Sequence, residues 1–129
     1  MGSKKTNEAL VLAYENCQTC KKALAWLDER GVAYRVRPIV EEPPTLDEIA
    51  AWIPSSEVPI RKWLNTSGMS FRAIGKAKID AASEAELTKW LAKDGKLVKR
   101  PVLVLGSAKA PSRVLVGFKP EAWSEAVER

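Results

Sequence analysis

The spacing of apolar positions changes several times along the chain, and each change predicts a new element. Residues 9–14 form a continuous apolar run, which predicts a central strand covered on both faces. Over residues 17–30 the apolar positions recur at helical spacing, which predicts a helix that ends at Gly31. The alternating segment 34–37 stands before Pro38 and predicts a second strand nearer an edge of the sheet. A strand–helix–strand order normally makes the two strands parallel.

The middle of the chain carries helix signals instead of strand signals. Two capping boxes predict helix starts, Thr45 with Glu48 and Ser83 with Glu86. The first helix is expected to extend through Trp52 and to be broken by the Pro-Ser-Ser sequence at 54–56. A short helix over 60–64 is expected to close at the turn 65–68, and the second capped helix is expected to end at 94–95.

The C-terminal part returns to strands. Apolar runs at 102–105 and 114–116 are separated by a short loop, which predicts a hairpin with antiparallel pairing. Pro120 then begins a terminal helix. The complete order (βαβ, helical insertion, ββα) is that of an α/β, thioredoxin-like fold with a mixed four-stranded sheet. A chain of 129 residues is long enough for one such domain, which we place at 8–129 after a disordered polar tail at 1–7.

Composition then excludes several classes of function. The chain has no histidine, which excludes Ser-His-Asp and Cys-His catalysis. The net charge of +5 favours anionic partners, but the basic residues are dispersed, so direct DNA binding is not expected. No apolar run is long enough to cross a membrane, and no secretory signal is present. We therefore expect a protein of the reducing cytoplasm, without a membrane partner.

The two cysteines, Cys17 and Cys20, form a C-x-x-C pair between the first predicted strand and its helix. The unpaired N–H groups at a helix N-terminus favour a thiolate at Cys17, and Cys20, one turn further on, is within reach as a resolving thiol. A structural zinc site is a second interpretation, but it needs four ligands, and the chain offers two cysteines and no histidine. The third is a pair that packs or forms a static bridge, which closes too short a loop to add much stability. We prefer the redox interpretation.

Arg100 and Pro101 are a second candidate feature, because an apolar strand follows them. A residue before proline is held extended. In the functional interpretation Arg100 faces the Cys17 thiolate or an anionic substrate, and Pro101 is a cis proline beside the site. In the alternative, Arg100 is an ordinary surface arginine and Pro101 an ordinary start of a strand. The sequence leaves both interpretations open.

The chain also carries a series of short motifs in a fixed order: NCQTCKKA at 16–23, WL at 26–27, NTSG at 65–68, KRPV at 99–102 and GFKP at 117–120. Together they resemble the arsenate-reductase-like (ArsC) family, which includes the Spx-type regulators. The resemblance extends from about Leu10 to about Trp123. It implies a thioredoxin-like fold with a helical insertion, with Cys17 as the nucleophile and Arg100 as the arginine before the proline.

The resemblance also implies the residues that bind the substrate: Asn16, Thr19, Asn65, Arg100, Pro101 and Lys119. Asn65 and Lys119 match positions where arsenate reductases of this family hold the anion with arginine. Asn65 carries no charge and Lys119 lacks the planar fork of a guanidinium, which argues against arsenate as the physiological substrate.

Two functions follow from the resemblance. The first is a thiol-dependent reductase of a small oxyanion or a disulfide, with Cys17 as nucleophile and Cys20 or an external thiol as the resolving group. It needs no bound cofactor or metal, and its reductant would be glutathione, glutaredoxin or thioredoxin. The second is a Spx-type transcription regulator, in which a Cys17–Cys20 bridge changes the fit to RNA polymerase.

Overall fold

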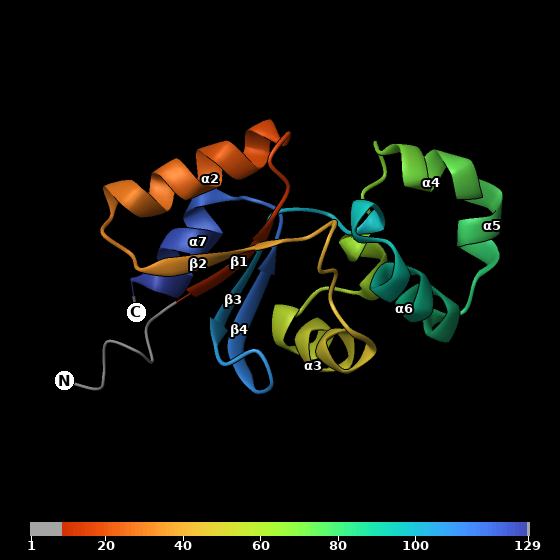
Figure 1. The fold of residues 1–129 in the computed structure, drawn as a ribbon. Helices are drawn as coiled ribbons and strands as arrows, with labels where there is room; N and C mark the ends of the chain where they lie inside the picture. The colour runs from red at the N-terminus through yellow and green to blue at the C-terminus, as the bar shows by residue number, and fades with distance from the viewer. Residues whose placement is uncertain (1–8, 129) are drawn as a thin grey trace.

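The structure is a computed structural model that describes residues 9–128. Its strands are β1 (Ala9–Ala13), β2 (Tyr34–Pro38), β3 (Val102–Gly106) and β4 (Pro111–Val116). Its α-helices are α2 (Gln18–Glu29), α3 (Leu46–Ser56), α4 (Met69–Ile74), α5 (Lys76–Ala81), α6 (Glu84–Lys93) and α7 (Pro120–Val127). Two 3-10 turns are η1 (Ile60–Trp63) and η2 (Gly95–Leu97). Figure 1 shows their arrangement. The tail expected at 1–7 lies outside the described residues.

The sheet is mixed, with strand order β2-β1-β3-β4. Strands β1 and β2 are parallel, whereas β1 with β3 and β3 with β4 are antiparallel. These pairings confirm the predicted βαβ unit, the hairpin, the edge position of the second strand and the thioredoxin-like plan. Strand β4 begins earlier than the predicted run at 114–116, because pairing continues past a register shift at Leu105/Gly106 as far as Pro111.

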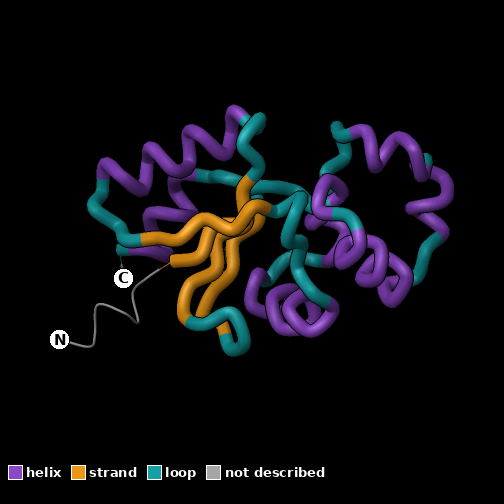
Figure 2. The backbone as a smooth tube through the Cα atoms, in the orientation of Figure 1, coloured by secondary structure: helices purple, strands orange, loops and turns teal. Residues whose placement is uncertain are grey.

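Side chains alternate across the sheet, so each strand contributes to two cores. On one face Val11 of β1 belongs to a buried cluster with Leu27 of α2 and Trp123 of α7. On the other face Leu12 belongs to a cluster with Trp52 of α3. Figure 1 shows α2 and α7 together on one side of the sheet, and Figure 2 shows the strands in orange between these helices and the helical insertion. The apolar run of β1 is continuous because both of its faces are covered.

The helix starts agree with the capping boxes, but one predicted helix end is wrong. Both boxes are formed, at the first turns of α3 and α6. Helix α3 does not break at 54–56; it continues through Pro54 to Ser56 and is capped by Glu57 in the left-handed region, with φ 61°. Pro54 removes one hydrogen bond of the ladder, and the helix ends two residues after it.

Helices α4 and α5 of the insertion were not predicted. Each has six residues, and Ile79 is the buried residue in the pair. Arg61 of η1 donates from Nη1 to the Ile79 carbonyl at 2.9 Å and from Nη2 to the Ala82 carbonyl at 2.8 Å. These bonds hold the end of α5, where the Ile79 carbonyl also accepts from the N–H of the C-cap residue Ala82. A contact distant in sequence therefore stabilises a helix whose own apolar pattern is weak.

An ion pair joins β2 to α3. The Arg37 guanidinium donates to both carboxylate oxygens of Glu48, at 2.9 and 2.8 Å. Burial disfavours the charge on Glu48, but Arg37 and the Thr45 amide outweigh burial and hold the pKa of this carboxyl below its usual range. Glu48 thus serves both the capping box and the attachment of the insertion to the sheet.

Backbone hydrogen bonds attach the insertion to the start of β3. Leu64 and Val98 form an antiparallel bridge. Beside it the Lys99 N–H donates to the Trp63 carbonyl at 2.7 Å, and the Asn65 N–H donates to the Leu97 carbonyl at 2.8 Å. This short ladder holds the turn that begins at Asn65 next to the segment that precedes β3.

No helix within residues 9–128 combines the length and the apolar character that a membrane crossing requires.

Candidate functional site

Cys17 is the N-cap residue of α2. Its backbone is extended, with φ −105° and ψ 113°, and its Sγ accepts a hydrogen bond from the Cys20 N–H at 3.1 Å. Its own N–H donates to the Tyr14 carbonyl at 3.1 Å, which closes the turn between β1 and the helix. The half-buried sulfur therefore faces the free N–H groups of the helix, as the spacing predicted. The sulfur thus accepts a hydrogen bond at the end of the helix where the dipole is positive.

Cys20 lies one turn further along α2 and has an exposed fraction of 1%. Burial is the main reason that the pKa of its thiol rises to about 12, and a hydrogen bond to the Cys17 sulfur raises it further. A backbone hydrogen bond with Tyr14 and the charge of Arg100 act in the opposite direction. Both cysteines are free thiols. At neutral pH Cys20 is therefore a protonated donor beside Cys17.

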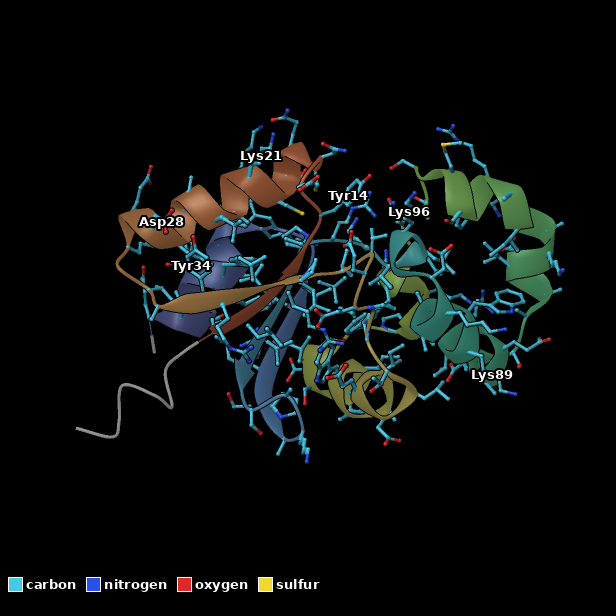
Figure 3. All side chains as sticks on the ribbon, viewed as in Figure 1. Tyr14, Lys21, Asp28, Tyr34, Lys89 and Lys96 are labelled. Atoms are coloured by element: carbon cyan, nitrogen blue, oxygen red, sulfur yellow. The ribbon has the colours of Figure 1, made fainter. Side chains whose placement is uncertain are left out.

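Arg100 reaches the same place from the segment before β3. Its guanidinium carbon lies 4.8 Å from the centre of the Tyr14 ring, and its Nη1 donates to the Lys96 carbonyl at 3.4 Å. Figure 3 labels these two partners of Arg100: Tyr14, which follows β1, and Lys96, which lies in η2. The Arg100–Pro101 peptide bond is cis, as in the functional interpretation of this motif.

These elements surround a pocket of about 410 Å³. Of the sequence-predicted site residues, the pocket lining contains Cys17, Thr19, Asn65, Arg100 and Lys119. Asn16, Cys20 and Pro101 are not in the lining, although each is adjacent in sequence or hydrogen-bonded to a residue that is. The structure thus brings most of the predicted set around one space.

Strand pairing explains why residues far apart in sequence meet here. Leu12, near the end of β1, pairs with Val102 at the start of β3, and Val102 pairs with Val116 at the end of β4. The turns that carry Cys17, Arg100 and Lys119 therefore leave or enter the sheet at the same end. The antiparallel pairing of β1 with β3 was not predicted from the sequence, so this convergence could not be derived from it.

The lining also contains residues that sequence reasoning did not select: Ser67, Gly68, Lys99, Gly117 and Phe118. Lys99 is the most informative of them. Gly117 has φ +79°, and a Cβ placed there would lie 2.9 Å from the Lys99 Cε, so the lysine chain crosses the open side of this glycine. The sequence signals for Lys99 were its position beside Arg100 in the KRPV motif and its place in a modest basic cluster with Lys96 and Arg100.

Electrostatically the pocket is suited to an anion. Its lining holds three cationic side chains, Lys99, Arg100 and Lys119, and no carboxylate. Asn65 adds no charge; its Nδ2 donates to the Lys96 carbonyl at 3.3 Å and its Oδ1 accepts from the Ser67 hydroxyl at 3.4 Å. Within the described part of the chain, no group of three Cys, Asp or Glu residues could hold a metal ion.

Comparison with known structures finds the same architecture in other proteins. An ArsC-family related protein from Bacteroides fragilis is 43% identical, with a TM-score of 0.84 over 91% of this chain and 95% of that one. A possible arsenate reductase from Streptococcus mutans is 34% identical, with a TM-score of 0.77 over 90% of this chain and 97% of that one.

Sequence comparison gives relatives of two kinds. The Bacillus subtilis protein YusI is 39% identical over 113 residues, which are 87% of this chain and 92% of YusI. The global transcriptional regulator Spx of Listeria monocytogenes is 29% identical over 89 residues, which are 69% of this chain and 67% of Spx. The family model described as ArsC family matches residues 12–126. This protein therefore belongs to the ArsC family, which confirms the resemblance carried by the cysteine and KRPV motifs.

Proposed function

We propose that this protein is a thiol-dependent oxidoreductase in which Cys17 attacks a disulfide bond that has anionic groups nearby. One observation carries the proposal: the Cys17 sulfur shares its pocket with three cationic side chains and no carboxylate. The Cys20 N–H and thiol both donate to this sulfur, and the helix N-terminus adds its dipole. The thiolate is the nucleophilic form of cysteine, and the proposal assigns that role to Cys17.

In the first step the Cys17 thiolate attacks one sulfur of the substrate disulfide. A bond forms between the two sulfurs, the substrate S–S bond breaks, and the other half leaves as a thiolate. Arg100 and the two lysines stabilise the incoming and departing negative charge. The substrate can reach Cys17 from the solvent because this residue is only half-buried.

In the second step an external thiol releases the adduct. A glutathione thiolate displaces the bound half and takes its place on Cys17, and a second glutathione removes it as glutathione disulfide. Two thiols are thus oxidised for each substrate disulfide reduced. We prefer this route to resolution by Cys20, because Cys20 is buried and burial is the main cause that raises the pKa of its thiol. Glutaredoxin or thioredoxin would serve the same step as protein reductants, and the reducing cytoplasm would supply them.

A disulfide substrate fits the pocket better than arsenate does. An oxyanion is best held by paired planar donors, and Arg100 is the single guanidinium in the lining. Asn65 has no charge to offer an anion, and its amide already donates to the Lys96 carbonyl. The pocket instead offers point charges spread along its wall, which suit carboxylates attached to a disulfide.

The test compares two disulfides of similar size. Dithiodiglycolate has two carboxylates, and bis(2-hydroxyethyl) disulfide has none. Glutathione supplies the thiol, and NADPH consumption by glutathione reductase is the readout. We expect turnover of both, with faster turnover of dithiodiglycolate at low salt, and little arsenate reduction. Cys17→Ser should abolish turnover, whereas the matched Cys20→Ser variant should retain it because a hydroxyl can still donate to Cys17. Full activity in the Cys17→Ser protein would refute the proposal.

The similarity to Spx supports a second candidate, a redox switch that binds RNA polymerase. Cys17 and Cys20 are hydrogen-bonded to each other, so oxidation could join them with little rearrangement of α2. In this function the bridge changes a protein contact, and no substrate is turned over. Capture of RNA polymerase on the immobilised protein, with and without dithiothreitol, separates the two functions: redox-dependent capture favours the switch, and disulfide turnover without capture favours the enzyme.

A further inference from the structure

The turn between β4 and α7 forms one wall of the Cys17 pocket. It contributes Gly117, Phe118 and Lys119 to the pocket lining. It also bears on Lys99, because the lysine chain crosses the open side of Gly117. Lys119 is the N-cap residue of α7, and its side chain makes no capping hydrogen bond. The places of two pocket cations, Lys99 and Lys119, therefore depend on how this turn is held.

Two hydrogen bonds hold the turn, and both are made by the backbone of Gly117. Its N–H donates to the Pro101 carbonyl at 2.8 Å, which ties the turn to the segment that carries Arg100. Its carbonyl accepts from the indole N–H of Trp123 at 3.0 Å, and this second bond is buried. A buried carbonyl that loses its donor is costly, so without the indole the turn would have to move toward another partner.

The ring of Trp123 supports the same turn from below. Trp123 has an exposed fraction of 0% and meets the Phe118 ring edge to face, with the ring centres 4.9 Å apart. Both rings also pack edge to face on Trp26, at 6.1 and 5.9 Å. Trp26 belongs to α2, the helix that Cys17 caps. Trp123 thus joins the turn to the helix of the nucleophile, but it is not itself in the pocket lining.

We propose that Trp123 is a positioning residue for the charge of the Cys17 pocket. Its indole N–H holds the Gly117 carbonyl, and through this turn it places Lys99 and Lys119 where the carboxylates of a substrate meet them. The inference rests on the proposed function, because it takes anionic disulfides as the substrates. Since Trp123 does not line the pocket, its effect falls on the binding of carboxylates and not on the exchange step at the Cys17 sulfur.

Trp52 provides a matched control for Trp123. It too has an exposed fraction of 0%, and its indole N–H also donates to a backbone carbonyl, that of Ala108, at 2.7 Å. Trp52 belongs to the core on the other face of the sheet, and Ala108 lies in the loop between β3 and β4, at the end of the hairpin away from Gly117. Replacing either tryptophan with phenylalanine removes one buried indole and leaves one carbonyl without its donor. The general cost to the fold is therefore comparable, and the effect on the pocket is not.

The first test measures binding apart from chemistry. Dithiodiglycolate is titrated into the Cys17→Ser protein, which lacks the nucleophilic sulfur, and the Kd is taken from the amide NMR shifts of Lys99 and Lys119. In this background Trp123→Phe should weaken binding about fivefold, as expected when charged groups lose their alignment with a carboxylate. Trp52→Phe should leave the Kd unchanged. Circular dichroism checks that both variants are folded.

The second test uses turnover in proteins that keep Cys17. Trp123→Phe should raise the KM of dithiodiglycolate about fivefold without lowering kcat, which is the signature of lost binding that is uniform along the reaction. The KM of bis(2-hydroxyethyl) disulfide should change no more in Trp123→Phe than in Trp52→Phe, because this substrate has no carboxylate. A merely structural role for Trp123 would lower turnover of both disulfides alike, as in the control, and that result would overturn the inference.

A third measurement needs no tryptophan variant and answers the question if Trp123→Phe does not fold. During the titration of the Cys17→Ser protein with dithiodiglycolate, the indole N–H signal of Trp123 should shift, and that of Trp52 should stay fixed. A fixed Trp123 signal, while the Lys99 and Lys119 amides move, would overturn the inference. If it is overturned and the wild type still reduces both disulfides, the proposed function stands without it. If binding depends on Trp123 but no disulfide is reduced, the proposed function fails and the role of Trp123 in holding the anion-binding wall stands.

Discussion

The buried thiol of Cys20 predicts a specific loss of stability at alkaline pH. The pKa of this thiol is about 12 in the folded protein, against an ordinary value of 9.0, chiefly because burial penalises the thiolate. Between these two values an unfolded chain has released the Cys20 proton, but the folded chain still holds it. The unfolded state therefore binds fewer protons, and the free energy of unfolding must fall as pH rises. Below about pH 8 this contribution is complete and constant.

The expected size follows from the linkage relation. One unit of pKa difference corresponds to about 1.4 kcal/mol, so raising the pH from 8 to 10 should cost the wild type about 1.3 kcal/mol through this group alone. Lysines and tyrosines also titrate in this range. For that reason the prediction concerns the difference between wild type and Cys20→Ala, because the variant keeps all other groups and lacks this thiol.

The assay is urea denaturation at pH 7, 8, 9 and 10 with a phosphine reductant, so that no disulfide forms. Cys20→Ala is expected to differ from wild type by a constant amount up to pH 8, and the wild type should then lose stability more steeply. If the two proteins lose stability in parallel from pH 8 to pH 10, Cys20 is not a buried neutral thiol, and its assignment as a protonated donor to Cys17 is wrong.

Three further predictions concern the site and its support. Iodoacetamide at pH 7 should alkylate Cys17 before Cys20 in the folded protein, as mass spectrometry of the products would show; simultaneous labelling contradicts the assigned geometry. Gly117→Ala should cost about 1–2 kcal/mol in urea denaturation because its φ is positive, and it should reduce the preference for dithiodiglycolate by displacing Lys99; an unchanged preference would mean that Lys99 does not act on the substrate. Glu48→Gln keeps the capping box but loses the ion pair, so it should lower the free energy of unfolding by about 1.5–3 kcal/mol at pH 7. Because ion pairing holds the pKa of Glu48 low, that deficit should shrink as pH falls below about 4, and a deficit independent of pH would contradict the pairing.

Much of the fold could be predicted because its signals are local. A capping box involves residues three positions apart, so Thr45 and Ser83 marked helix starts correctly. The error at Pro54 has a local origin as well: the cost of a helical proline depends on where the helix ends, and that end was not encoded in the motif itself. Helices α4 and α5 escaped prediction because α5 is held by Arg61, which lies far from it in sequence.

By itself the sequence determined that two cysteines stand at the start of a helix after a buried strand, and that alone predicts a reactive sulfur at Cys17. The tertiary structure decided what surrounds that sulfur. Antiparallel pairing of β1 with β3 places Arg100 at the same end of the sheet as Cys17, and the Leu64–Val98 bridge brings the turn at Asn65 to meet them. The close approach of Lys99 to Gly117 also depends on segments that meet only after folding. The physical reason is that helix capping depends on neighbours in sequence, whereas a pocket's charge depends on which strand ends the sheet brings together.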